Sequence, residues 1–220
     1  FFFVIILSLK IPEISKFLLV ALILRIFLIL FGYYISPLPD SGADAVTFER
    51  DAWKMGKDGF FNLIKNFTGP SPHFISWLIG IPYSLFGRSI LMAQSISLLF
   101  GMGCIYLSWL VAREIWGNKV AIKVGWTIAL FPSVTLYSVL ILREVYIVFF
   151  LLLALYGITL WIKTYSFKSM IISTIGFVGA VFFHGGLLVG ALIFFSIMGY
   201  TSIKKILSLF INLKINFKFL

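Results

Sequence analysis

The sequence predicts an all-α integral membrane protein, built as a polytopic bundle of about six transmembrane helices. The first observation behind this prediction is composition: 61% of the 220 residues are hydrophobic and only 12% are charged. Water-soluble domains contain about 45–50% apolar and about 25% charged residues. The second observation is a mean hydropathy of +1.07, and the third is a series of long apolar stretches. A water-soluble fold of this length could not bury so much apolar surface.

Six of these stretches are expected to span the membrane, because a helix needs about 20 residues to cross the hydrocarbon. A further apolar run, 74–86, is only about 13 residues long and contains Pro82. Runs of about 10–14 residues more often lie at the interface or re-enter the membrane than span it. The six expected spans are residues 17–35, 89–112, 120–141, 145–162, 169–183 and 187–203.

The basic residues orient these helices, because loops rich in Lys and Arg face the cytoplasm. If 74–86 does not span, both termini are cytoplasmic, residues 36–87 form an outer loop, and residues 204–220 form a cytoplasmic tail of a single domain covering 1–220. If 74–86 did span, the later basic junctions would face outward and the rule would fail repeatedly. In the first arrangement the cytoplasmic residues are Lys10, Lys16, Arg113, Lys119, Lys123, Lys163, Lys168, Lys204 and Lys205.

The formal net charge of +10 does not indicate nucleic-acid binding. The basic residues are spread through short gaps between apolar runs, without a basic helix or an aromatic-basic patch. The one cysteine, Cys104, lies inside an apolar run, so no disulfide can form within the chain. The bilayer is therefore the first partner that the composition predicts.

The outer loop is expected to carry two helices that lie along the membrane surface. It opens with turn-forming residues at 36–42, where Pro37 and Pro39 cannot continue a helix. A helix from Asp44 to about Lys57 follows, with apolar positions that suit a membrane surface. A second break at 68–72 precedes the short apolar helix 74–86.

Asp44 and Asp40 are the first candidate catalytic residues. A carboxylate at the membrane–water boundary, beside a helix N-terminus, can act as a general base or hold a cation. The structural alternative is that both are turn and cap residues. Glu49 and Asp51 lie further along the same helix, where we expect them to be solvated or paired with Arg50 and Lys54.

Arg143, Glu144 and Arg25 interrupt apolar sequence. Charged residues at membrane depth are costly, so they usually face the protein interior, a cavity or the interface, and often serve function. The structural alternative for Arg143 and Glu144 is a tight turn at a helix end. Arg25 lies in the middle of the first span, and we expect it to snorkel, to line an aqueous cavity, or to pair with Glu144 or a loop carboxylate.

Weaker candidates are His184 and Arg88, both at the expected outer boundary. His184 is more consistent with an interfacial hydrogen-bonding residue than with a ligand, because His73 lies in a different loop and no His/Cys metal site is predicted. Arg88 could bind a phosphate or anchor a helix end. Gly101 and Gly103 indicate close helix packing. No nucleotide-binding glycine motif or nucleophile elbow is present.

The order of these features resembles the GT-C membrane glycosyltransferases, near the protein mannosyltransferase and aminoarabinose transferase group. In that family an outer-loop Asp-Glu motif is followed at set intervals by an aromatic residue and Ala. Asp44, Phe48 and Ala52 fall at matching steps. Ala45 stands in place of the second acid, and Ser71 stands where relatives often have a lysine near the lipid phosphate. These departures bear on the acid–base and phosphate-binding residues.

Three further segments carry the resemblance, which covers about residues 17–165. Residues 72–77 and 83–87 match the family's Pro-rich turn, short aromatic helix and Phe-Gly ending. Residues 113–117 match its cytoplasmic Arg-x-x-x-Gly turn, and residues 131–144 resemble the region around its third helix. We expect the chain to be a short member of the family or a piece of a longer one.

The resemblance implies transfer of a sugar, with inversion, from a polyprenyl-phosphate donor to a glycan, lipid or protein acceptor at the outer face. Asp44 would be the base, with Asp40 or Glu144 orienting it. Arg143 or Arg88 would stabilise charge on the departing phosphate. No cofactor is expected, and no residue pattern calls for a divalent metal.

Two other functions compete with this interpretation. A polysaccharide polymerase also uses outer-loop charges and lipid-linked glycans, but its donor is an oligosaccharide repeat. A transporter or a non-catalytic subunit of a membrane complex would agree with the short chain and with Ala45. A transporter should show broken helices, mid-membrane charges or inverted repeats. Only Arg25 matches that description, and no repeat is visible.

Overall fold

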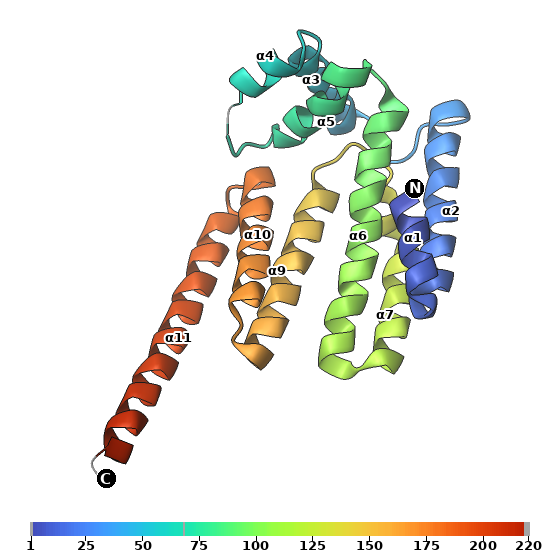
Figure 1. The fold of residues 1–220 in the computed structure, drawn as a ribbon. Coiled ribbons are helices and arrows are strands. Elements are labelled where there is room, and N and C mark those ends of the chain that lie inside the picture. Colours follow the sequence, from blue (N-terminus) through green and yellow to red (C-terminus); the bar gives the residue numbers. More distant parts are fainter. Residues whose placement is uncertain (1, 68, 218–220) are drawn as a thin grey trace. The chain divides into compact units, whose positions relative to one another are not determined.

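The computed structural model describes residues 2–67 and 69–217, and every regular element in these ranges is an α-helix. The chain divides into two compact units, residues 1–185 and 186–220. The first unit is a helical bundle with three helices across one end (Figure 1). The second consists of α11 (Leu187–Phe217). The predicted all-α helical bundle is confirmed.

Four helices are long and apolar enough to cross a membrane. They are α2 (Pro12–Tyr34), α6 (Ile90–Trp116), α9 (Glu144–Thr164) and the part of α11 from Leu187 to Lys204. They coincide with four of the six predicted spans, and they identify an integral membrane protein. The apolar helix expected at 169–183 is also present as α10 (Phe167–Phe183). Its 17 residues place it at the short end of the range of about 17–25 residues for membrane-spanning helices. A short helix, α1 (Phe2–Lys10), precedes α2.

The predicted single span at 120–141 is wrong. This stretch contains α7 (Asn118–Leu130), the short α8 (Pro132–Tyr137) and a non-helical segment from Ser138 to Arg143. Pro132 has no N–H to donate to the preceding turn, and its ring disfavours helical backbone at the residue before it. Phe131 accordingly has φ −64° and ψ 120°, an extended conformation. Hydropathy does not reveal this break, because the segments on both sides of it are apolar.

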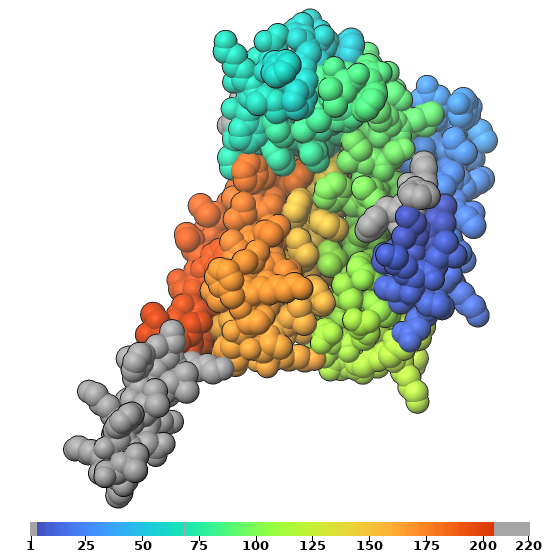
Figure 2. Space-filling model, viewed as in Figure 1, coloured from blue at the N-terminus to red at the C-terminus, as the bar shows by residue number. Residues whose placement is uncertain are grey.

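Three helices form what we call the cap: α3 (Ala43–Gly56), α4 (Phe60–Lys65) and α5 (Phe74–Phe86). They lie across one end of the bundle, and in the space-filling view they cover that end (Figure 2). The predicted helices at 44–57 and 74–86 are therefore present, and α4 is an addition. Gly56 permits close approach of α3 to α5, because a Cβ at this position would lie 2.7 Å from the carbonyl oxygen of Gly80.

The cap is joined to the bundle by hydrogen bonding and aromatic packing. The Ser71 backbone N–H donates to the Phe182 carbonyl at 3.2 Å. The Phe74 ring lies 4.9 Å, centroid to centroid, from both Phe182 and Phe183 at the end of α10. Aromatic pairs at these separations add stability beyond their buried area. These contacts fix the cap over the ends of the helices.

Glycines bring the helices of the bundle close together, as predicted for Gly101 and Gly103. A Cβ at Gly101 would lie 2.1 Å from the Ser138 Cβ, and one at Gly103 would lie 2.4 Å from the Phe149 ring. Gly176 on α10 meets the backbone of Ala154 on α9, where a Cβ would be 2.3 Å from the Ala154 nitrogen. Small residues at helix contacts are typical of membrane proteins.

Candidate functional site

Three of the predicted carboxylates line one cavity at the cap end of the bundle. Asp40 and Asp44 reach it from the turn before α3 and from the first turn of α3, and Glu144 reaches it from the start of α9. The cavity, which we call the carboxylate pocket, has a volume of about 560 Å³, within the range of small-molecule sites. Its lining residues are Asp40, Gly42, Ala43, Asp44, Tyr137, Leu142 and Glu144.

The turn before α3 explains how two aspartates reach the pocket. Asp40 has φ +59°, a left-handed conformation that Asp tolerates better than most residues. The Ser41 N–H donates to the Leu38 carbonyl at 3.2 Å, which closes the turn. Asp44 lies in the first turn of α3, where the helix N-terminus favours negative charge. Asp44 thus lies in the first helical turn and lines the pocket, while Gly42 is the N-cap residue and no side chain caps the helix.

Glu144 carries an unused acceptor. Its Oε1 atom lies 3.8 Å from Arg143 Nε, whereas its Oε2 atom is buried and has no hydrogen-bond partner among the described residues. The Glu144 side chain as a whole is 46% exposed, so this oxygen can accept a hydrogen bond from a group that enters the pocket. A hydroxyl group of a ligand would provide one. Tyr137 and Leu142 line the pocket beside Glu144, whereas Arg143, the sequence candidate next to Glu144, is not among the lining residues.

Arg88 does not line the carboxylate pocket, because Glu49 holds it elsewhere. Arg88 Nε donates to Glu49 Oε1 at 2.9 Å and Arg88 Nη2 to Oε2 at 2.6 Å, while the Tyr83 hydroxyl donates to Oε1 at 3.0 Å. The hydrogen bond from Arg88 is the main cause that lowers the pKa of Glu49. The expectation that Glu49 is solvated or paired with Arg50 and Lys54 is therefore wrong, as Glu49 is only 5% exposed.

Asp51 lies on the outer side of the cap. Its Oδ1 pairs with Lys54 Nζ at 3.4 Å, as predicted, and its Oδ2 lies 3.5 Å from His73 Nδ1. The His73 ring in turn meets Phe48 edge-on, with 5.8 Å between the ring centroids. Asp51 therefore contacts Lys54 and His73 and does not line the carboxylate pocket.

Arg25 is fully buried in α2, and its predicted pairing with Glu144 or a loop carboxylate is wrong. Its Nε donates to Ser138 Oγ at 2.8 Å, and its Nη1 donates to the carbonyls of Ala129 at 3.0 Å and Ala21 at 3.2 Å. The sequence offered no sign of these acceptors, because Ala129 and Ser138 lie more than 100 residues further along the chain.

His184 is exposed and follows α10, where its N–H donates to the Ala180 carbonyl at 3.0 Å. It lies outside the carboxylate pocket. In the ranges that the structure describes, no three His, Cys, Asp or Glu side chains are grouped as metal ligands.

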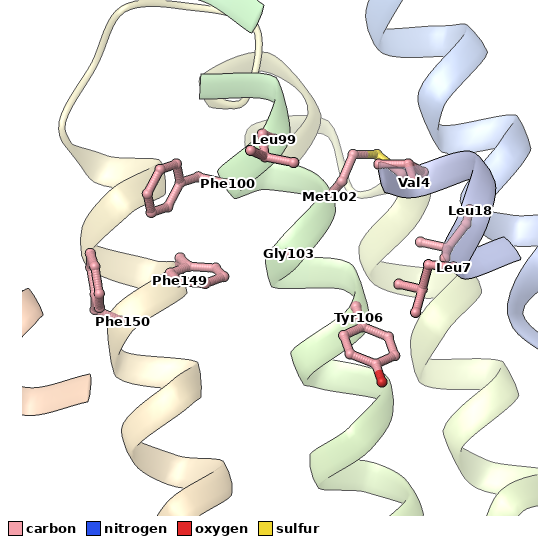
Figure 3. A pocket seen from close by; sticks show the side chains of 10 residues that line it. All are labelled: Val4, Leu7, Leu18, Leu99, Phe100, Met102, Gly103, Tyr106, Phe149 and Phe150. Carbon is pink, nitrogen blue, oxygen red and sulfur yellow. The ribbon is translucent and has the colours of Figure 1, made fainter. Parts of the chain in front are cut away.

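A second cavity, which sequence reasoning missed, lies along the bundle. We call it the apolar groove; its volume is about 500 Å³, a size that suits part of a hydrocarbon chain. Phe100, Phe149 and Phe150 form one side of it, and residues of α1 and α2 form the other (Figure 3). Phe149 is five residues after Glu144 on α9, on the order of 7–8 Å along the helix. The remaining lining residues are Val4, Leu7, Leu18, Leu99, Met102, Gly103 and Tyr106.

No protein-family model, no curated protein and no solved structure matches this chain.

Proposed function

We propose that this chain is a membrane glycosyltransferase that transfers a sugar from a polyprenyl-phosphate donor to an acceptor hydroxyl. The observation that carries the proposal is the meeting of Asp40, Asp44 and Glu144 in one cavity at the end of a membrane bundle. The resemblance to the GT-C enzymes implies roles for the same three residues. The pocket also contains the unpartnered Oε2 of Glu144, which can accept a hydrogen bond.

The proposed reaction is a single displacement at the anomeric carbon. The acceptor oxygen forms a bond to this carbon while the bond from the carbon to the phosphate oxygen breaks, and polyprenyl phosphate leaves with the electron pair. The proton of the acceptor hydroxyl passes to the Asp44 carboxylate. Glu144 Oε2 receives a hydrogen bond from the donor or acceptor sugar, and Asp40 orients the acceptor beside Asp44.

Charge develops on the departing phosphate, and a cation is needed to stabilise it. Arg143 is the proposed cation, because it adjoins Glu144 and its side chain is 28% exposed. Arg88 is not proposed for this role, because its Nε and Nη2 donate to Glu49 and it does not line the carboxylate pocket. Arginine suits a phosphate better than lysine does, because its planar group can donate two parallel hydrogen bonds.

The apolar groove supports a lipid-linked donor. An amphipathic ligand needs polar contacts at one end and an apolar surface for its chain, and the groove starts about one to two turns along α9 from Glu144. The cap end of the bundle would face the outer side of the membrane. In that orientation the basic residues Arg113, Lys119 and Lys163 face the cytoplasm, in agreement with the positive-inside rule.

Turnover by purified protein in nanodiscs, supplied with a panel of polyprenyl-phosphate sugars, tests the proposal. We expect Asp44→Asn to lower kcat by about 100-fold or more, because a general base contributes about 10²–10⁴-fold. The matched control is Asp58→Asn, which alters an exposed carboxylate in the turn after α3 and should leave turnover unchanged. Circular dichroism would verify that both variants are folded.

Three results would contradict the proposal in different ways. Full activity in Asp44→Asn would remove Asp44 as the base. Turnover only with lipid-linked oligosaccharide repeats would identify a polymerase. Stable, folded wild-type protein without turnover on any donor would favour a non-catalytic subunit or a transporter.

A further inference from the structure

Arg25 is a buried charge whose position in the membrane requires a physical explanation. It lies nine residues before the end of α2, on the order of 13 Å from that end. Its side chain is fully buried, and no ion pair with a carboxylate is formed by Arg25 within the described residues. A charge at this depth is costly unless polar groups surround it. The acceptors that it uses indicate what the charge does.

Two of the three acceptors flank the break in the chain: the Ala129 carbonyl lies in the last turn of α7, and Ser138 follows α8. Where α7 ends, its last carbonyl groups lose their helical partners, and lipid provides no donor to replace them. Arg25 Nη1 donates to one of these carbonyls, that of Ala129, at 3.0 Å, and Thr135 Oγ1 donates to the same oxygen at 3.3 Å. Arg25 therefore satisfies the helix end that Pro132 creates.

Arg25 also fixes the start of the non-helical segment that follows α8. Its Nε donates to Ser138 Oγ at 2.8 Å, and Ser138 Oγ donates to the Thr135 carbonyl at 2.8 Å. Gly101 on α6 makes room for this contact, since a Cβ there would lie 2.1 Å from the Ser138 Cβ. Ser138 is thus held between α2 and α6. The five residues after it run directly to Glu144, and Val139, Leu140, Ile141 and Leu142 are buried.

We propose that Arg25 is a positioning residue for the carboxylate pocket. By holding Ala129 and Ser138, it sets the path of residues 138–143, which places Leu142 and Glu144 on the pocket wall opposite Asp40 and Asp44. Arg25 does not line the pocket and acts only through this segment. The description of the pocket as an active site rests on the proposed function, whereas the control of its geometry does not.

Hydrogen exchange measured by mass spectrometry in nanodiscs tests the geometric part directly. Arg25→Met keeps an unbranched side chain but removes every donor. We expect amide exchange at residues 139–143 to become about tenfold faster, the effect of losing about one net hydrogen bond, while exchange in α6 and α10 stays near the wild-type rate. Ser138→Ala should accelerate the same amides, and the double variant should be no faster than Arg25→Met.

Ser76→Ala is the matched control, because Ser76 is also fully buried and donates one hydrogen bond, to the Phe48 carbonyl in the cap. It should leave exchange at 139–143 unchanged. Arg25→Lys should restore part of the protection, since an ammonium group can reach one acceptor but cannot bind two with a fixed fork. The proposal is overturned if Arg25→Met accelerates exchange equally throughout the bundle, or not at all at 139–143.

Kinetics provide the second readout and separate the two proposals. If the protein turns over a donor, Arg25→Met should lower kcat per folded molecule and leave the KM for the donor within about twofold, because the groove is untouched. A change in KM alone would contradict a positioning role. If the wild type turns over no donor, the proposed function fails, and the exchange experiment still decides whether Arg25 controls the pocket wall.

Discussion

Arg88 at the edge of the cap and Arg25 inside the bundle are both held by several hydrogen bonds, but they use different acceptors. Arg88 binds both oxygens of Glu49, and its side chain remains 47% exposed. Arg25 is fully buried and binds a hydroxyl and two backbone carbonyls. A carboxylate is thus neutralised at the cap, whereas within the bundle a cation completes a helix end. Each arginine joins segments that are distant in sequence.

The difference shows that access to solvent determines which acceptors each arginine binds. At the edge of the cap solvent reaches Arg88 but hardly reaches Glu49, so the ion pair compensates the desolvation of the carboxylate. Inside the bundle no water can satisfy the backbone carbonyls exposed by a broken helix, so donors on another helix are needed. Arg25 donates to one such carbonyl, that of Ala129 at the end of α7, and also to the Ala21 carbonyl in α2 and the Ser138 hydroxyl after α8.

The largest expected effect would break the bundle side of this comparison. Gly101→Val places a branched side chain against Ser138, where even a Cβ would lie 2.1 Å from the Ser138 Cβ. We expect a loss of about 3 kcal/mol in the free energy of unfolding, because overpacking a tight contact typically costs about 1–3 kcal/mol. Thermal unfolding in detergent would measure it. The control Gly190→Val, at a position where no described atom lies within 4 Å of a Cβ, should change stability by less than about 0.5 kcal/mol.

A smaller effect is expected at the cap. Arg88→Ala leaves the nearly buried Glu49 carboxylate with only the Tyr83 hydroxyl, so we expect a loss of about 2 kcal/mol in the free energy of unfolding. The matched control is Arg50→Ala, because Arg50 is exposed on the same helix as Glu49. Equal stability of the two variants would show that the pair contributes nothing, and the cap would then depend on its aromatic contacts.

The smallest effect depends on pH and sharpens the contrast between the two arginines. Because the pKa of Glu49 is lowered from 4.5 by folding, its pairing contributes fully above pH 4.5 and is lost as pH falls through the folded pKa. Wild-type protein should therefore lose more thermal stability than Glu49→Gln between pH 6 and pH 3. Arg25→Lys has no carboxylate partner to protonate, so it should follow the wild-type pH dependence. Parallel pH profiles for wild type and Glu49→Gln would contradict this assignment.

Composition and apolar length were sufficient to predict the bundle, because the bilayer imposes both on the sequence, and turn residues helped to locate two of the three cap helices, α3 and α5. The break at Pro132 was predictable from the proline itself, because proline cannot continue a helix. The predicted span at 120–141 rested on apolar length instead. The Glu49–Arg88 pair was not predictable, since 39 residues separate the partners and Arg50 and Lys54 are closer along the helix. Local spacing favours near neighbours, and only tertiary packing selects among them.

Only part of the candidate site was predicted from the sequence. Asp44 was placed correctly in the first turn of α3 by the turn residues before it. Its approach to Glu144 was suggested by family resemblance, because no periodicity connects residues 100 positions apart. Tyr137 and Leu142 were missed, since an aromatic and an aliphatic residue in an apolar stretch carry no distinguishing chemistry. The apolar groove was missed for the same reason.

The acceptors of Arg25 also impose an order on biosynthesis. Ser138 lies 113 residues after Arg25, so α2 leaves the ribosome long before two of the three acceptors of Arg25, Ala129 and Ser138, exist. At about 5–20 residues per second, the delay is roughly 6–23 s. During that interval the guanidinium has to reach toward the membrane surface. The contacts of Arg25 with Ala129 and Ser138 can therefore form only after α7 and α8 have been translated.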